Sequence, residues 1–143
     1  MEQPIWIVLL GDVVDSRSIA DRQGFQTQLE GACQVIAARH ADDLMAGPVV
    51  LKGADEFGAV LTSYRPVYAV VSAFDVLLPR HARFAVARGA IDTGLASGRL
   101  ERMDGPAFHE ASTAMEELKE TGLPFAMRGL SRREVSSRKI RSL

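Results

Sequence analysis

The sequence has few of the residues that would cross-link a chain or anchor it in a membrane. Its 143 residues include one cysteine, Cys33, which excludes an intramolecular disulfide and gives no support for a zinc cluster. The N-terminal apolar run, residues 5–10, is too short for a transmembrane helix or for the apolar region of a signal peptide. We therefore expect a soluble protein of the reducing cytoplasm that makes no membrane contact.

The chain also lacks a large net charge. Its formal net charge is −1, which argues against nucleic-acid binding by the chain as a whole. Residues 128–143 nevertheless hold six basic side chains against one acid, Glu134, so residues 1–127 carry about −6. We expect one domain over residues 1–129 and a basic tail over residues 130–143. That tail would be a solvated extension, a nucleic-acid contact or the stub of a missing second region.

Apolar periodicity predicts alternating strands and helices. Strands are expected at residues 5–10, 48–51, 57–61, 81–91 and 123–127, and helices at residues 18–39, 66–78 and 106–121. Ser18 and Asp21 resemble a capping box, and Gly122 a helix C-cap. The order βαββαβαβ predicts an α+β fold of the ferredoxin-like palm type, an antiparallel sheet with helices on one face.

Two acidic turns are expected to meet at one edge of this sheet. Asp12 and Asp15 follow the first strand, while Asp55 and Glu56 lie in the turn of the predicted hairpin. A crossover helix makes the first two strands parallel, so their ends lie at the same edge. Acids in a hairpin turn are often simply solvated, but clustered carboxylates favour a divalent cation such as Mg²⁺ or Mn²⁺.

Phosphate-binding groups are expected beside these acids. Gly11 and Gly53, read as tight turns, would let backbone N–H groups approach a phosphate. The basic residues Arg17, Lys52 and Lys119 are candidate phosphate partners, although a single residue of this kind is more often a solvated surface charge.

Four short motifs, in this order, resemble the SatD family. They cover residues 9–17, 52–57, 88–94 and 105–111. That family's N-terminal domain is similar to the palm of class III nucleotidyl cyclases and GGDEF diguanylate cyclases. The resemblance implies that Asp12 and Asp55 are metal carboxylates, that residues 53–57 correspond to the GGDEF signature with Ala54 as its second residue, and that Lys119 contacts phosphate. Such palms commonly work in pairs, which implies a homodimer.

The chain departs from the cyclase pattern where catalysis would be decided. Class III cyclases carry a transition-state Asn and Arg on the third helix, and the corresponding positions here look like His109 and Thr113. Ala54 adds a methyl group where the nucleotide approaches closely. Charge stabilisation at the transition state is a large catalytic term, so no catalytic residue is assigned. We expect a domain that binds a nucleoside triphosphate with Mg²⁺ or Mn²⁺, either weakly catalytic or a sensor.

Two other functions remain open from the sequence. Ala85, Ala87 and Gly89 form a small-residue face on the strand expected at residues 81–91, which another surface could approach closely. That face motivates a non-catalytic dimerisation module. The basic C-terminus motivates a regulatory protein that contacts nucleic acid through it.

Overall fold

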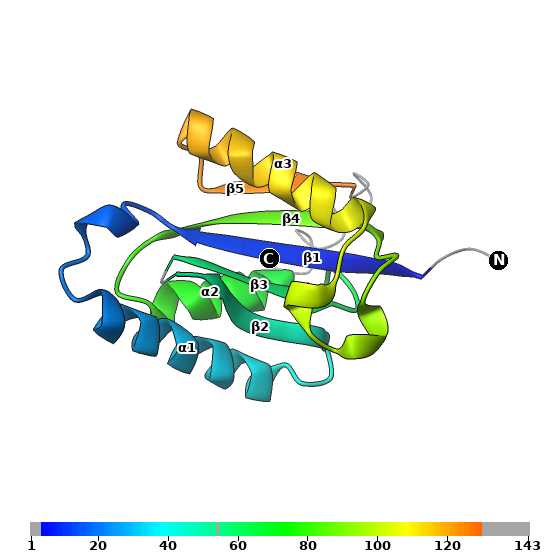
Figure 1. Ribbon diagram of the computed structural model, residues 1–143, viewed down its shortest axis with the longest axis horizontal. Helices are drawn as coiled ribbons and strands as arrows, with labels where there is room; N and C mark the ends of the chain where they lie inside the picture. The colour runs from blue at the N-terminus through cyan, green and yellow to red at the C-terminus, as the bar shows by residue number, and fades with distance from the viewer. Residues whose placement is uncertain (1–3, 54, 130–143) are drawn as a thin grey trace, which may run out of the picture.

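The computed structural model describes residues 4–53 and 55–129 of the chain as an α+β fold (Figure 1). The elements follow the predicted order. They are β1 (Ile5–Val13), α1 (Arg22–Arg39), β2 (Leu44–Lys52), β3 (Glu56–Leu61), α2 (Val67–Leu77), β4 (Ala82–Ala90), α3 (Pro106–Thr121) and β5 (Phe125–Arg128). Three short 3₁₀ segments, Ser16–Ser18, Leu95–Ser97 and Leu100–Arg102, lie in the connections.

The five strands form one sheet in the order β2-β3-β1-β4-β5. β3 lies between β2 and β1 and is antiparallel to both, as predicted. β4 is also antiparallel to β1, whereas the short edge strand β5 pairs with β4 in parallel. β5 is parallel because it returns through the crossover helix α3. The wholly antiparallel sheet expected from the sequence is therefore wrong at this one edge.

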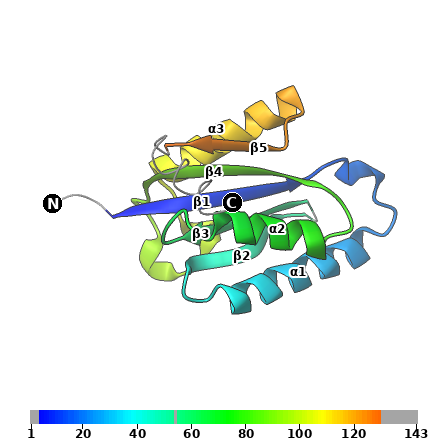
Figure 2. The same cartoon turned by 180° about the vertical axis from the view of Figure 1, so that it is seen from behind.

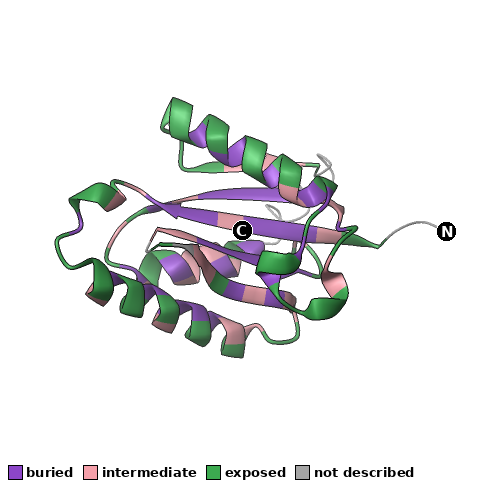
Figure 3. Cartoon of the chain, viewed as in Figure 1, coloured by how far each residue is buried: buried purple, intermediate pink, exposed green. Residues whose placement is uncertain are grey.

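The helices cover both faces of the sheet, which corrects the expectation that they share one face. Along β1, Ile7 and Leu9 pack in the cluster that includes α1 and α2, while Val8 packs in a second cluster with Ala107 and Ala111 of α3. Alternate residues of a strand point to opposite faces, so α3 lies across the sheet from the other two helices. Figures 1 and 2 show this arrangement from two sides, and the buried stretches of β1 and β4 between the layers appear purple in Figure 3.

The small side chains of β4 are used within the chain. Ala85 and Ala87 are fully buried, and an added Cβ on Gly89 would lie 3.2 Å from the backbone of Ala107. The surface that approaches this face is therefore α3. This face is therefore not available to a second copy of the chain, and the homodimer itself stays a prediction.

Three aromatic rings fill the core beneath α1 and α2. Phe57 lies with its ring centroid 4.6 Å from that of Phe74 and 5.8 Å from that of Phe84. Gly11 lies inside β1 rather than in a turn, and a Cβ there would meet the Phe57 ring at 2.2 Å. The interpretation of Gly11 as a tight turn is therefore wrong. Its missing side chain makes room for an aromatic ring.

The start of α1 also differs from its predicted position. Asp21 caps the helix by accepting a hydrogen bond from the Gly24 amide, and Ser18 lies in the preceding 3₁₀ segment. α3 begins at Pro106 and ends at Gly122, which adopts a left-handed conformation, as predicted. Among the described helices, none combines the length and apolar character needed to cross a bilayer.

Candidate functional site

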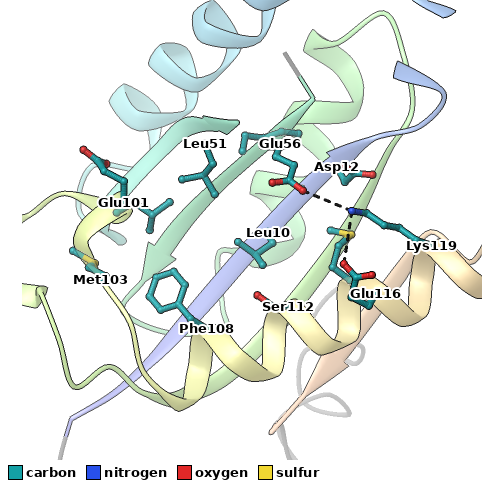
Figure 4. A pocket seen from close by; sticks show the side chains of 14 residues that line it. Leu10, Asp12, Leu51, Glu56, Glu101, Met103, Phe108, Ser112, Glu116 and Lys119 are labelled. Carbon is teal, nitrogen blue, oxygen red and sulfur yellow. Dashed lines mark ion pairs between the residues drawn. The ribbon is translucent and has the colours of Figure 1, made fainter. Parts of the chain in front are cut away.

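A pocket opens between the sheet and α3, at the end of β1 where the two acidic turns were expected to meet. Its volume is ≈ 400 Å³. Figure 4 shows Asp12, Glu56, Glu116 and Lys119 at one end, and Leu51, Met103 and Phe108 with the carboxylate Glu101 at the other. β1, the β2–β3 hairpin, the segment before α3 and α3 itself all contribute to the lining.

Strand alternation brings the charged residues together. Asp12 follows Val8 and Leu10 on the face of β1 that α3 covers. The register pairs Asp12 with Glu56 on β3 and with Arg83 on β4. Asp12 Oδ2 lies 3.7 Å from Arg83 Nη1, and both side chains are largely buried. Asp12 is thus held between a second carboxylate on one side and a guanidinium on the other.

The environment of Asp12 opposes its ionisation. Burial raises the pKa of its carboxyl above the usual value, and the nearby charges of Asp55 and Glu56 add to the increase. Lys119 and Arg83 pull the pKa in the opposite direction without cancelling the effect of burial. A buried carboxylate beside other acids is an arrangement that a divalent cation would relieve.

Lys119 reaches the same place from α3. Its Nζ lies 3.6 Å from Glu56 Oε1 and 4.0 Å from Glu116 Oε1, one helical turn away. Figure 4 shows the ammonium group between these carboxylates and beside Asp12. Of the charges that act on Asp12, that of Lys119 has the largest effect.

Of the other predicted site residues, Gly11 lines the pocket, whereas Asp55, Asp15, Gly53 and Arg17 are not part of its lining. Asp55 accepts a hydrogen bond from Ser16 and acts on Asp12 electrostatically. Asp15 has a left-handed backbone and its carbonyl accepts a hydrogen bond from Arg80. Gly53 has φ +51° in the hairpin turn, and Arg17 lies in the exposed 3₁₀ segment. The side chain of Lys52 and the whole of Ala54 lie outside the described part of the structure.

The pocket meets the requirements of Mg²⁺ only in part. Within residues 4–53 and 55–129, no cluster of three or more His, Cys, Asp or Glu side chains is arranged to hold a metal. Mg²⁺ is commonly bound through one or two carboxylates with substrate phosphates completing its shell. Asp12 and Glu56 fit that second arrangement and not a cage made of protein ligands alone.

The opposite end of the pocket was missed by the sequence reasoning. Residues 94–104 lie between the strands and helices that the sequence predicts, yet Leu100 and Met103 are buried and line the pocket. Phe108 and Ser112 of α3 join them. Phe108, Ser112, Met115 and Lys119 recur at helical spacing of three or four residues, a signal that could have identified the lining face.

The two α3 positions matched to the cyclase Asn and Arg point away from the pocket lining. His109 is exposed and lies 3.0 Å from Asp104, and Thr113 is exposed too. Neither lines the pocket; their neighbours Phe108 and Ser112 do. Arg83 was likewise not among the predicted residues. The sequence of its strand does not reveal the register, and so it does not reveal which carboxylate lies opposite the Arg83 side chain.

Comparisons with known proteins agree with this architecture. Residues 6–122 match the model of the SatD family. No curated protein matches the chain. A solved structure described as a bacterial light-regulated adenylyl cyclase is similar with a TM-score of 0.58 and 14% identity, over 89% of this chain and 77% of that one. Another with the same description gives a TM-score of 0.55 and 14% identity, over 86% of this chain and 42% of that one. At such identity the likeness establishes the palm fold and nothing finer.

Proposed function

The chain belongs to the SatD family, and from that premise we propose that its pocket binds a nucleoside triphosphate together with Mg²⁺ or Mn²⁺. One observation carries this function. Asp12 and Glu56 are paired on adjacent strands at one end of a ≈ 400 Å³ pocket whose other end is mainly apolar, with one carboxylate, Glu101. Ligand pockets of this size commonly combine apolar walls with a few convergent polar groups.

Each end of the pocket suits one part of a nucleotide. Leu51, Met103 and Phe108 offer apolar and aromatic surface on which a planar base could stack. Asp12 and Glu56 would hold the metal, Asp55 would strengthen the negative field, and Lys119 would contact phosphate oxygens. Bound Mg²⁺ would neutralise charge on the phosphates and fix their orientation.

We propose binding, with turnover weak or absent. The sequence of α3 contains neither Asn nor Arg, and its pocket face carries Phe108 and Ser112 instead. Removing a single transition-state donor from an enzyme commonly costs about 10²–10³ in kcat. A sensor that reports nucleotide occupancy, or a slow nucleotidyl transferase, is consistent with such a site.

Isothermal titration calorimetry with ATP and GTP in Mg²⁺ or Mn²⁺ tests the proposal. Asp12→Asn should weaken binding at least about tenfold, equivalent to about 1.4 kcal/mol, because it removes a metal carboxylate. Asp42→Asn, which removes an exposed carboxylate on the loop after α1, is the matched control and should bind like the wild type. Absence of binding by the wild type, or equal binding by Asp12→Asn, contradicts the proposal.

A further inference from the structure

Lys119 is already paired with the carboxylates that a metal ion would need. Its Nζ lies 3.6 Å from Glu56 and acts on Asp12 more strongly than any other charge does. Arg83 pairs with Asp12 from the other side at 3.7 Å. Asp12 and Glu56 are therefore each paired with a cationic side chain, and Figure 4 shows the pair formed by Lys119 and Glu56.

These two cations differ in how firmly they are held. Arg83 belongs to β4 and its side chain is only 20% exposed, so most of it is enclosed by neighbouring residues. Lys119 is 36% exposed, projects from the last turns of α3, and has a second carboxylate, Glu116, within 4.0 Å. A flexible four-carbon side chain of this kind can exchange partners at little energetic cost. Lys119 is the cation that a ligand could displace.

We propose that Lys119 occupies the cation position of the empty pocket, so that a divalent metal enters only together with a phosphate-bearing ligand that draws Lys119 away from Glu56. This inference rests on the proposed function and adds its order of assembly. A free metal ion would meet Asp12 and Glu56 already paired with Arg83 and Lys119, and the described residues include no group of three or more His, Cys, Asp or Glu side chains that could hold it. A triphosphate supplies both missing elements: oxygens for the metal and negative charge for the ammonium group.

The test is a titration of the protein with Mn²⁺ in the absence of nucleotide. The electron paramagnetic resonance signal of free Mn²⁺ reports how much of the ion remains unbound. Wild type should leave the free Mn²⁺ signal nearly unchanged, and Lys119→Met should bind Mn²⁺ at least about tenfold more tightly, because the competing cation is gone. Arg39→Met, which removes one positive charge from the far end of α1 on the opposite face, is the matched control and should behave as wild type. Lys119→Gln, which keeps a polar side chain, should repeat the result of Lys119→Met.

A second series adds inorganic pyrophosphate, ATP or GTP to the Mn²⁺ titration. In wild type, pyrophosphate or either nucleotide should recruit Mn²⁺ to the protein, and in Lys119→Met the ligand should bind at least about tenfold more weakly. Equal Mn²⁺ affinity in wild type and both Lys119 variants, including no binding by any of them, overturns the role of Lys119. Failure of wild type to bind ATP or GTP with Mn²⁺ overturns the proposed function. The role of Lys119 is tested independently, by comparing the Mn²⁺ affinities of wild type and the Lys119 variants without nucleotide.

Discussion

At the scale of single residues, Asp12 is placed where its charge weakens the folded chain. Its folded-state pKa is raised above the value of 3.8 expected for an unfolded chain, chiefly by burial. The folded state therefore holds the proton more tightly, and folding stability falls as pH rises from the unfolded pKa through the raised folded pKa. Above that window the loss is constant, and below it the loss is absent. Sites that serve binding often sacrifice stability in this way.

Asp12→Asn should accordingly stabilise the fold at neutral pH while weakening metal-dependent binding. The gain over wild type should shrink as pH is lowered through the same window, because the wild-type carboxyl then becomes neutral as well. Urea unfolding between pH 4 and 8 measures it, with Asp42→Asn as the control for loss of an exposed charge. A gain that is independent of pH, or one that grows towards low pH, contradicts the assignment.

Gly11 gives a second residue-scale prediction. A methyl group at this position would lie 2.2 Å from the Phe57 ring, which is almost fully buried against Phe74 and Phe84. Gly11→Ala should destabilise the fold by about 1–3 kcal/mol through overpacking. Gly31→Ala, inside α1 with no atom within 4 Å of the added methyl group, should instead stabilise it by about 0.5–1 kcal/mol. Urea denaturation of both variants checks the contrast. Equal effects would show that the Phe57 ring can shift to accommodate the methyl group at little energetic cost.

At the scale of elements, α3 decides the shape of the pocket because it carries Phe108, Ser112 and Lys119. Ala111, fully buried against the sheet, sets how closely the helix approaches. Ala111→Leu should cost about 1–3 kcal/mol and weaken nucleotide binding, since the larger side chain lifts the helix. Glu110→Leu adds the same side chain at the neighbouring exposed position and should stay within about 0.5 kcal/mol of wild type. Unfolding curves give the stability of both variants and calorimetry gives their nucleotide affinity. The comparison separates the effect of a larger side chain at the helix–sheet contact from the effect of adding a leucine to α3.

The elements that could be predicted were those with strong local signals. The strand and helix order, the hairpin, Pro106 at the start of α3 and Gly122 at its end follow from periodicity and cap chemistry. The face that α3 covers could not be predicted, because small residues such as Ala85 and Ala87 indicate a close approach without saying what approaches. The start of α1 was misplaced because Ser18 and Asp21 are both good N-caps, and tertiary contacts decide between them.

At the scale of the whole molecule, strand order predicted the meeting of Asp12 with the hairpin acids. β3 pairs Asp12 directly with Glu56, so Glu56 lines the pocket, whereas Asp55 acts from its edge. A one-residue difference of this kind depends on register, which sequence motifs do not specify. Arg83, Leu100 and Phe108 were missed for a related reason. Each belongs to the site through packing of distant elements, and none lies in a motif of its own.

Ligand binding should be visible in the stability of the whole molecule. A ligand that binds only the folded state at 100 times its Kd adds about 2.7 kcal/mol, which corresponds to a rise in Tm of roughly 5–10 °C for a chain of this size. Wild type should show that rise with Mn²⁺ and ATP or GTP together, and little with either alone, since metal and phosphate complete one another's sites. Differential scanning calorimetry measures Tm in four conditions: without ligand, with Mn²⁺ alone, with nucleotide alone, and with both. Asp12→Asn should lose at least about half of the combined rise, because a tenfold weaker Kd leaves about 1.4 kcal/mol of the 2.7 kcal/mol, whereas Asp42→Asn should keep all of it. A rise with nucleotide in the presence of EDTA equal to that with metal would mean that the pocket carboxylates take no part in binding.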